Sequence, residues 1–73
     1  MRIYVAGPYT KGDVAVNVRK AIDVTLVLLQ AGHTPFCPHL SYLVQLVEPV
    51  DYERWLEYDF RWIDVCEALV RDP

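Results

Sequence analysis

Basic residues, long apolar runs and cysteines are all scarce in this sequence, and each scarcity excludes a class of protein. Seven Lys and Arg residues stand against ten Asp and Glu residues, which gives a net charge of −3. Because the basic residues are also scattered along the chain, we expect no nucleic-acid binding through a basic stripe. No apolar run reaches the roughly 18 residues of a membrane span. We therefore expect no membrane association and a cytoplasmic location.

The two cysteines, Cys37 and Cys66, are too far apart for a CxxC redox motif and too few for a disulfide framework. We expect both to be reduced thiols in the core. Together with His33 and His39 they lack the ligand spacing of zinc sites, so we expect no metal site. The sequence indicates no cofactor either, because it contains no Walker or GxGxxG motif.

Apolar and aromatic residues are what the chain has in quantity. Its hydrophobic fraction is 53%, and two Trp, five Tyr and two Phe supply large packing groups. A chain of 73 residues can form one domain at most, with a marginal core. We therefore expect residues 1–73 to form a single, partial domain that folds or belongs to something that folds.

The beginning of the chain predicts a strand, a loop and a helix. Residues 3–5 (Ile-Tyr-Val) favour β structure, and this short apolar run ends at Gly7-Pro8. A long apolar segment follows Gly12, so the opening is typical of the first half of a βαβ unit. In open α/β sheets ligands bind beyond the carboxyl ends of the strands. The loop Gly7–Gly12 is therefore the first candidate for a site, and a plain connecting turn is the alternative.

The first helix is predicted over Val14–Ala31, with Asp13 as its N-cap and Gly32 as the residue that ends it. Asn17 is expected mostly away from the buried face. That face is predicted from residues recurring every three or four positions: Val14, Val18, Ala21, Ile22, Thr25, Leu28 and Leu29.

The rest of the chain predicts two strands and two helices. Pro35 and Pro38 place the second strand toward a sheet edge. Ser41 and Asp51 are the expected N-caps of the two helices. The predicted elements are a strand over 34–37, a short helix over 41–47, a helix from 52 to about 66 and a strand over 68–71.

Asp59 is out of place in the longer of these helices. On a helical wheel it falls in the middle of an apolar stripe, while Glu57 and Arg61 lie on the opposite face with the i,i+4 spacing of an ion pair. Burying a lone carboxylate is costly unless it is hydrogen-bonded, paired or faces a cavity. Asp59 is thus either an acid satisfied within the core or a functional acid in a cavity. The stripe comprises Tyr52, Trp55, Leu56, Ile63 and Cys66.

His39 follows the second predicted strand and is a weaker candidate. A single His after a strand is usually a structural side chain, but its position at a strand end also suits a binding site. Both interpretations stay open from the residues alone.

Three short motifs together resemble the nucleoside 2-deoxyribosyltransferase-like superfamily, and most of all its small bacterial and phage members that begin with AGPYT. They are Ile3-Tyr4-Val5-Ala6-Gly7-Pro8-Tyr9-Thr10, then Pro38-His39, then Asp59-x-x-Trp62-Ile63-x-x-Cys66-Glu67-Ala68-Leu69-Val70. The resemblance implies a flavodoxin-like or Rossmann-like three-layer α/β fold, with a partial parallel sheet in the order 2-1-3. It also implies a homo-oligomer that transfers or hydrolyses the N-glycosidic bond of a nucleoside or nucleotide.

The resemblance implies roles for five residues. Gly7, Pro8 and Tyr9 match the family's glycine loop and would shape the base or sugar pocket, with His39 at its rim. Asp59 matches the acid that contacts the sugar, so it would bind sugar hydroxyls or protonate the leaving group. It is the candidate catalytic residue.

The sequence also departs from the family pattern. Glu67 stands where relatives commonly carry Asp, and the family's nucleophilic Glu lies in a segment beyond the third strand, whereas this sequence stops at Pro73. We expect a truncated or shortened relative whose activity is impaired, with Asp72 as the one candidate substitute for that Glu. The alternative is a non-catalytic nucleotide-binding or assembly module.

Overall fold

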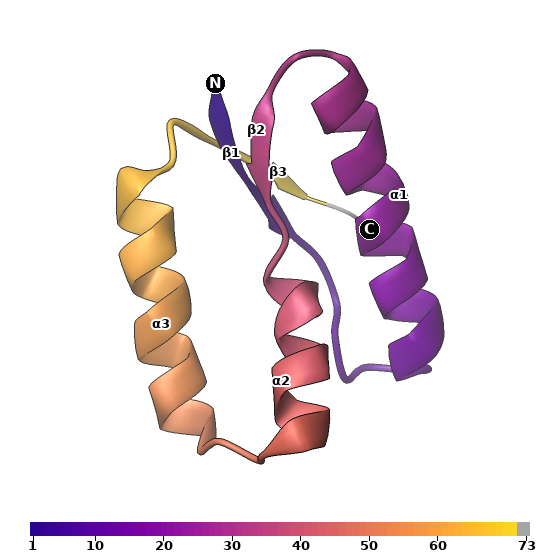
Figure 1. Cartoon of the computed structure of the whole chain (residues 1–73), viewed down its shortest axis with the longest axis vertical. Helices are drawn as coiled ribbons and strands as arrows, with labels where there is room; N and C mark the ends of the chain where they lie inside the picture. Colours follow the sequence, from indigo (N-terminus) through magenta and orange to yellow (C-terminus); the bar gives the residue numbers. More distant parts are fainter. Residues whose placement is uncertain (72–73) are drawn as a thin grey trace.

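A computed structural model of the chain describes residues 1–71 as an α/β fold with one three-stranded parallel sheet. The strand order is β2-β1-β3, as predicted. The elements, drawn in Figure 1, are β1 (Arg2–Ala6), α1 (Val14–Gln30), β2 (Thr34–Phe36), the 3₁₀ turn η1 (Pro38–Leu40), α2 (Ser41–Val47), α3 (Tyr52–Val65) and β3 (Ala68–Arg71).

The sheet lies between helices, with α1 on one side and α3 on the other (Figure 1). Side chains of β1 alternate between the two sides. Tyr4 belongs to the α3 side, where its ring lies 5.9 Å from that of Phe36. Phe36 in turn stacks on Trp62 of α3 with ring centroids 4.6 Å apart. These aromatic contacts attach α3 to the sheet and complete the three layers.

The central strand β1 supplies most of the core. Ile3, Tyr4 and Val5 are all buried, and Val5 is fully so, with 0% of its surface exposed. A parallel strand with neighbours on both edges and helices on both faces is expected to read as a continuous apolar run. The short run that ends at Gly7 has this character, and the prediction of a buried first strand is confirmed.

Helix α1 begins and ends near the predicted positions. Asp13 Oδ1 accepts the backbone N–H of Val16 at 3.2 Å, and Gly32 has the positive φ of 88° that ends a helix. The predicted helical face is wrong at two residues. Leu29 is 54% exposed, whereas Asn17 is only 8% exposed because its side chain bonds to the loop before the helix.

Of the predicted N-caps of the other two helices, Asp51 is confirmed in its position and Ser41 is wrong. Ser41 is not the N-cap of α2, because η1 runs directly into α2 and Leu40 takes that place without any side-chain capping bond. Asp51 is at the N-cap of α3, but its backbone carbonyl, not its side chain, accepts the first bonds, from Arg54 and Trp55. Helix α3 ends at Val65, one residue before the predicted end.

Other sequence predictions are confirmed. Glu57 and Arg61 form their ion pair at 3.0 Å on the exposed side of α3. Cys37 and Cys66 are free thiols, the first buried and the second half-buried. Glu67, the departure from the family pattern, has a structural role: its carboxylate accepts the backbone N–H of Arg2 at 3.0 Å and so joins the starts of β1 and β3.

The longest helix of residues 1–71 is α1, with 17 residues. None of the helices in this range combines the length and the apolar character needed to cross a membrane.

The burial of β1 predicts a strong position dependence for Val→Ala substitutions. Val5→Ala leaves a cavity at the centre of the sheet and should lower the free energy of unfolding by on the order of 2 kcal/mol. Val47→Ala is the matched control, since Val47 is 87% exposed, and should change it by less than about 0.5 kcal/mol. Urea denaturation measures both. Equal effects would contradict the placement of β1 at the core.

The edge strand β3 predicts that the 73-residue chain self-associates. Within residues 1–71, β3 pairs only with β1, and its Leu69 is exposed, so its other edge is open to a second copy. Light scattering should show dimers or larger species, and Leu69→Lys should shift them toward monomer. Leu26→Lys, at an exposed position of α1, should not. A monomer at high protein concentration would refute the prediction.

Candidate functional site

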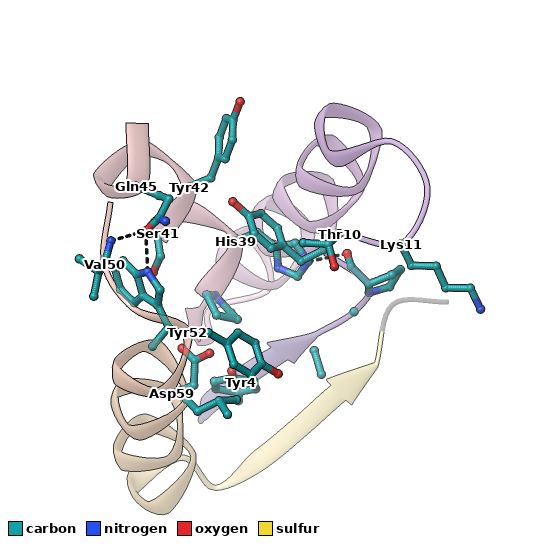
Figure 2. A pocket seen from close by; sticks show the side chains of 17 residues that line it. Tyr4, Thr10, Lys11, His39, Ser41, Tyr42, Gln45, Val50, Tyr52 and Asp59 are labelled. Carbon is teal, nitrogen blue, oxygen red and sulfur yellow. Dashed lines mark hydrogen bonds between the residues drawn. The ribbon is translucent and has the colours of Figure 1, made fainter. Parts of the chain in front are cut away.

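A cavity of about 760 Å³ opens at the carboxyl end of β1 (Figure 2). Its walls come from the end of β1, the following loop, η1, α2 and the first half of α3. Sites in open α/β folds occur at this place because strand ends and loops leave a crevice there. All five residues proposed from the sequence, Gly7, Pro8, Tyr9, His39 and Asp59, line the cavity.

Side chains from two other elements hold the loop after β1. The Asn17 amide of α1 donates to the carbonyl oxygens of Tyr9 and Lys11, at 2.9 and 2.8 Å. His39 Nε2 lies 2.9 Å from the carbonyl oxygen of Pro8. A carbonyl oxygen can only accept, so Nε2 carries the proton. The loop is thus fixed from α1 on one side and η1 on the other.

His39 lines the cavity, and its side chain is buried, not exposed at an open rim. His39 is only 3% exposed, because it packs beneath the loop, where the Tyr9 ring meets it edge-on at 5.9 Å. His39 thus has a structural role at the loop, and a functional role stays a prediction.

Gln45 organises the opposite wall. Its Oε1 atom accepts the backbone N–H of Val50 at 2.9 Å and the indole N–H of Trp55 at 2.8 Å. The two bonds, dashed in Figure 2, connect α2 to the linker and to α3. They hold Trp55 in place as part of the wall.

Aromatic rings make up much of the cavity lining. Tyr9 packs edge-on against Tyr42 with ring centroids 6.1 Å apart. The aromatic residues that line the cavity, besides His39, are Tyr4, Tyr9, Tyr42, Tyr52 and Trp55. Flat rings of this kind stack on other planar groups, so the cavity suits a ligand with an aromatic ring.

Asp59 faces the cavity from α3, with Tyr4 close to it (Figure 2). Within residues 1–71 no hydrogen bond reaches its carboxylate, which favours the cavity-facing acid over the satisfied core acid. Desolvation raises the pKa of Asp59, although nearby His39 acts in the opposite direction. Burial, followed by the charge of Asp59, raises the pKa of Tyr4 to about 12. Tyr4 therefore stays a hydrogen-bond donor at neutral pH.

Charged groups are few in the cavity. Among its lining residues within 1–71, Asp59 is the only carboxylate and Lys11 the only Lys or Arg. In that range, no group of three or more His, Cys, Asp or Glu side chains is placed to hold a metal ion. The cavity therefore offers one carboxyl group, the hydroxyl, amide and indole groups of its other polar side chains, and the Lys11 cation from the loop.

The sequence interpretation missed three residues of the site. Asn17 lies three residues after Val14 and four before Ala21, the spacing that defined the buried face, so the pattern contained the signal. Gln45 is the one amide in an otherwise apolar short helix, which is a weak signal. Lys11 carried none. Asp72, the proposed substitute nucleophile, lies outside the described residues.

Comparison with known proteins identifies a family without an assigned activity. The family model described as a domain of unknown function, DUF7768, matches residues 1–71. This chain belongs to the DUF7768 family. No curated protein and no solved structure gives a significant match to it. The relation of this DUF7768 chain to the nucleoside 2-deoxyribosyltransferases therefore stays a prediction, based on its motifs.

The raised pKa of Asp59 predicts that Asp59→Asn stabilises the fold at neutral pH. The folded state binds this proton more tightly than the unfolded chain does, so the stability linked to Asp59 is fully present below the unfolded pKa of about 3.9. This stability is lost as the pH rises through the pKa of Asp59 in the folded state, which is higher than in the unfolded chain. Asn is neutral at every pH, so the Asp59→Asn protein does not lose this stability.

Urea denaturation across the acid-to-neutral range measures this effect. The advantage of Asp59→Asn over the wild type should vanish below about pH 4, where Asp59 is protonated in both states. Other titrating groups contribute equally to the stability of the wild type and of Asp59→Asn, so their contributions cancel in the difference. Glu67, whose pKa is lowered mainly by the Arg2 backbone N–H, is one of them. Asp64→Asn, at an exposed position of the same helix, is the control. An Asp59→Asn protein that is less stable at neutral pH would contradict the prediction.

Proposed function

We propose that this DUF7768 domain binds a nucleoside or nucleotide and acts on its N-glycosidic bond by transfer or hydrolysis. The observation that carries the proposal is the carboxylate of Asp59, partly desolvated and without a hydrogen bond within residues 1–71, in an aromatic-lined cavity. The matches of Gly7–Thr10 and Asp59 to the deoxyribosyltransferase motifs support the same assignment.

The dimensions and lining of the cavity suit a nucleoside. Its volume of about 760 Å³ is within the usual range of about 300 to 1,000 Å³ for small-molecule sites. The rings of Tyr9, Tyr42 and Trp55 offer faces or edges to a base. Asp59 offers acceptor oxygens for sugar hydroxyls, which donate well to a carboxylate.

Cleavage of an N-glycosidic bond requires protonation of the leaving base and stabilisation of an oxocarbenium-like centre. A carboxylic acid with a raised pKa suits the first task, and such acid-base help is typically worth about 10² to 10⁴-fold. The second task in retaining glycosidases falls to a second carboxylate. Within residues 1–71 none lines the cavity besides Asp59. Asp72 is the one acidic residue of this sequence outside that range.

A non-catalytic nucleotide-binding module is the second candidate. The same single-carboxylate cavity favours it, because binding needs only the aromatic walls and the hydrogen-bonding groups. An assembly role would use the open edge of β3 instead. A binding module would release its nucleotide unchanged.

Incubation of the purified chain with deoxynucleosides and their 5′-monophosphates tests the proposal. We expect measurable binding, slow release of free base followed by chromatography, and a loss of at least about tenfold in that release in Asp59→Asn. Asp64→Asn is the control, because it leaves the cavity unchanged. Binding without release of base would establish the non-catalytic alternative. Release that survives Asp59→Asn but is lost in Asp72→Asn would transfer the catalytic role to Asp72.

A further inference from the structure

The side-chain amide of Gln45 has a fixed orientation in the cavity wall. Its Oε1 atom accepts the backbone N–H of Val50 at 2.9 Å and the indole N–H of Trp55 at 2.8 Å. Backbone and indole N–H groups can only donate, so the atom that faces them must be the oxygen of the amide. The two bonds also use both lone pairs of that oxygen. The amide therefore cannot turn over without placing its own N–H groups against two other donors.

The nitrogen of the same amide, Nε2, keeps its two N–H groups for other partners. Within residues 1–71 no group accepts a hydrogen bond from it. It is also not one of the enclosed side-chain nitrogen and oxygen atoms that lack a bond in that range. Figure 2 draws it on the side of the amide away from Val50. Because the Gln45 side chain lines the cavity, these N–H groups are available to a ligand there.

Ser41 is the nearest polar neighbour of Gln45 along the helix. It lies four residues earlier in α2, on the same side of the helix, and it lines the cavity too. A hydroxyl group rotates to donate or to accept, whereas the amide nitrogen of Gln45 only donates. Gln45 is therefore the one of the two that distinguishes an acceptor from a donor on the ligand.

The position of Gln45 suits contact with the edge of a base. Its amide holds the indole of Trp55, so it lies at the border of an aromatic wall of the cavity. Trp55 and Asp59 are four residues apart in α3 and thus one turn from each other. A nucleoside whose base lies against Trp55 has its sugar toward Asp59 and an edge of its base toward Gln45.

We propose that Gln45 selects the base, and that the site prefers bases with a carbonyl group at the edge that meets Nε2. Uracil, thymine, hypoxanthine and guanine carry such an acceptor, whereas cytosine and adenine carry an amino group in its place. An amino group would face the donors of Gln45 and leave a polar group without its hydrogen bond, which is costly. This inference names the substrate class of the proposed function and rests on it.

Calorimetric titration with two matched pairs of deoxynucleosides, also as their 5′-monophosphates, tests the inference. The pairs are deoxyuridine with deoxycytidine and deoxyinosine with deoxyadenosine. The members of a pair differ only in the carbonyl or amino group and in the proton on the adjacent ring nitrogen. In at least one pair, the wild-type chain should bind the carbonyl member about fivefold or more tightly, the effect of one hydrogen bond.

Gln45→Glu is the decisive variant. One carboxylate oxygen still accepts from Val50 and Trp55, while the other places an acceptor where Nε2 was. The preference for the carbonyl member should therefore fall at least fivefold or reverse. Gln30→Glu is the matched control, since Gln30 is an exposed residue of α1 outside the cavity lining. It makes the same change of charge and should keep the preference.

A measurement on the wild type does not depend on the folding of a variant. In the ¹⁵N-labelled chain, the side-chain amide signals of Gln45 should shift when the carbonyl member of the preferred pair binds. Those of Gln30, the other glutamine of the sequence, should not. Circular dichroism and a thermal melt verify that Gln45→Glu is folded. Unchanged Gln45 signals in the saturated complex would overturn the inference even if the variant does not fold.

The outcomes separate this inference from the proposed function. Equal affinity within both pairs, or preference for the amino members, would overturn the inference and leave the proposed function standing. A folded Gln45→Glu protein that keeps the full preference would overturn the role of Gln45. Binding of none of these nucleosides and monophosphates would overturn the proposed function and this inference with it.

Discussion

The rest of the structure depends on the burial of the central strand. Ile3, Tyr4 and Val5 form the middle of a parallel sheet whose two faces must both be covered. Helix α1 covers one face, and α3 covers the other through the stack of Phe36 on Trp62. In so small a chain this strand is most of the core. The cavity at its end therefore shares its support with the fold, so weakening the strand also weakens the site.

Buried polar side chains connect that core to the loop. Asn17 and His39 are the buried polar residues of the described chain, and both bond to loop carbonyls. Residues that break the apolar pattern are expected at functional sites, where a fixed geometry matters more than the small gain from apolar burial. A rigid loop also loses less entropy when a ligand binds. The same bonds thus stabilise the loop and, under the proposed function, hold it in a fixed shape for a ligand.

Local patterns made much of the fold predictable. The apolar run that ends at Gly7-Pro8, Gly32 at the helix end and Pro35 on an edge strand are signals within a few residues. The position of Asp59 on an apolar stripe pointed to the cavity for the same reason. The burial of His39 was not predictable in this way, because its partner Pro8 is 31 positions away. Gln45 bonds across ten positions to an indole, which no periodicity describes.

The raised pKa of Asp59 connects binding to chemistry. Its main cause is the removal of water, and the opposing influence of His39 is weaker. A ligand that fills the cavity expels more water from the carboxyl group and should raise the pKa further. A general acid works best when its pKa approaches the working pH. Partial removal of the Asp59 carboxylate from water costs stability at neutral pH. Under the proposed function, a ligand whose hydroxyl groups donate hydrogen bonds to this carboxylate offsets that cost.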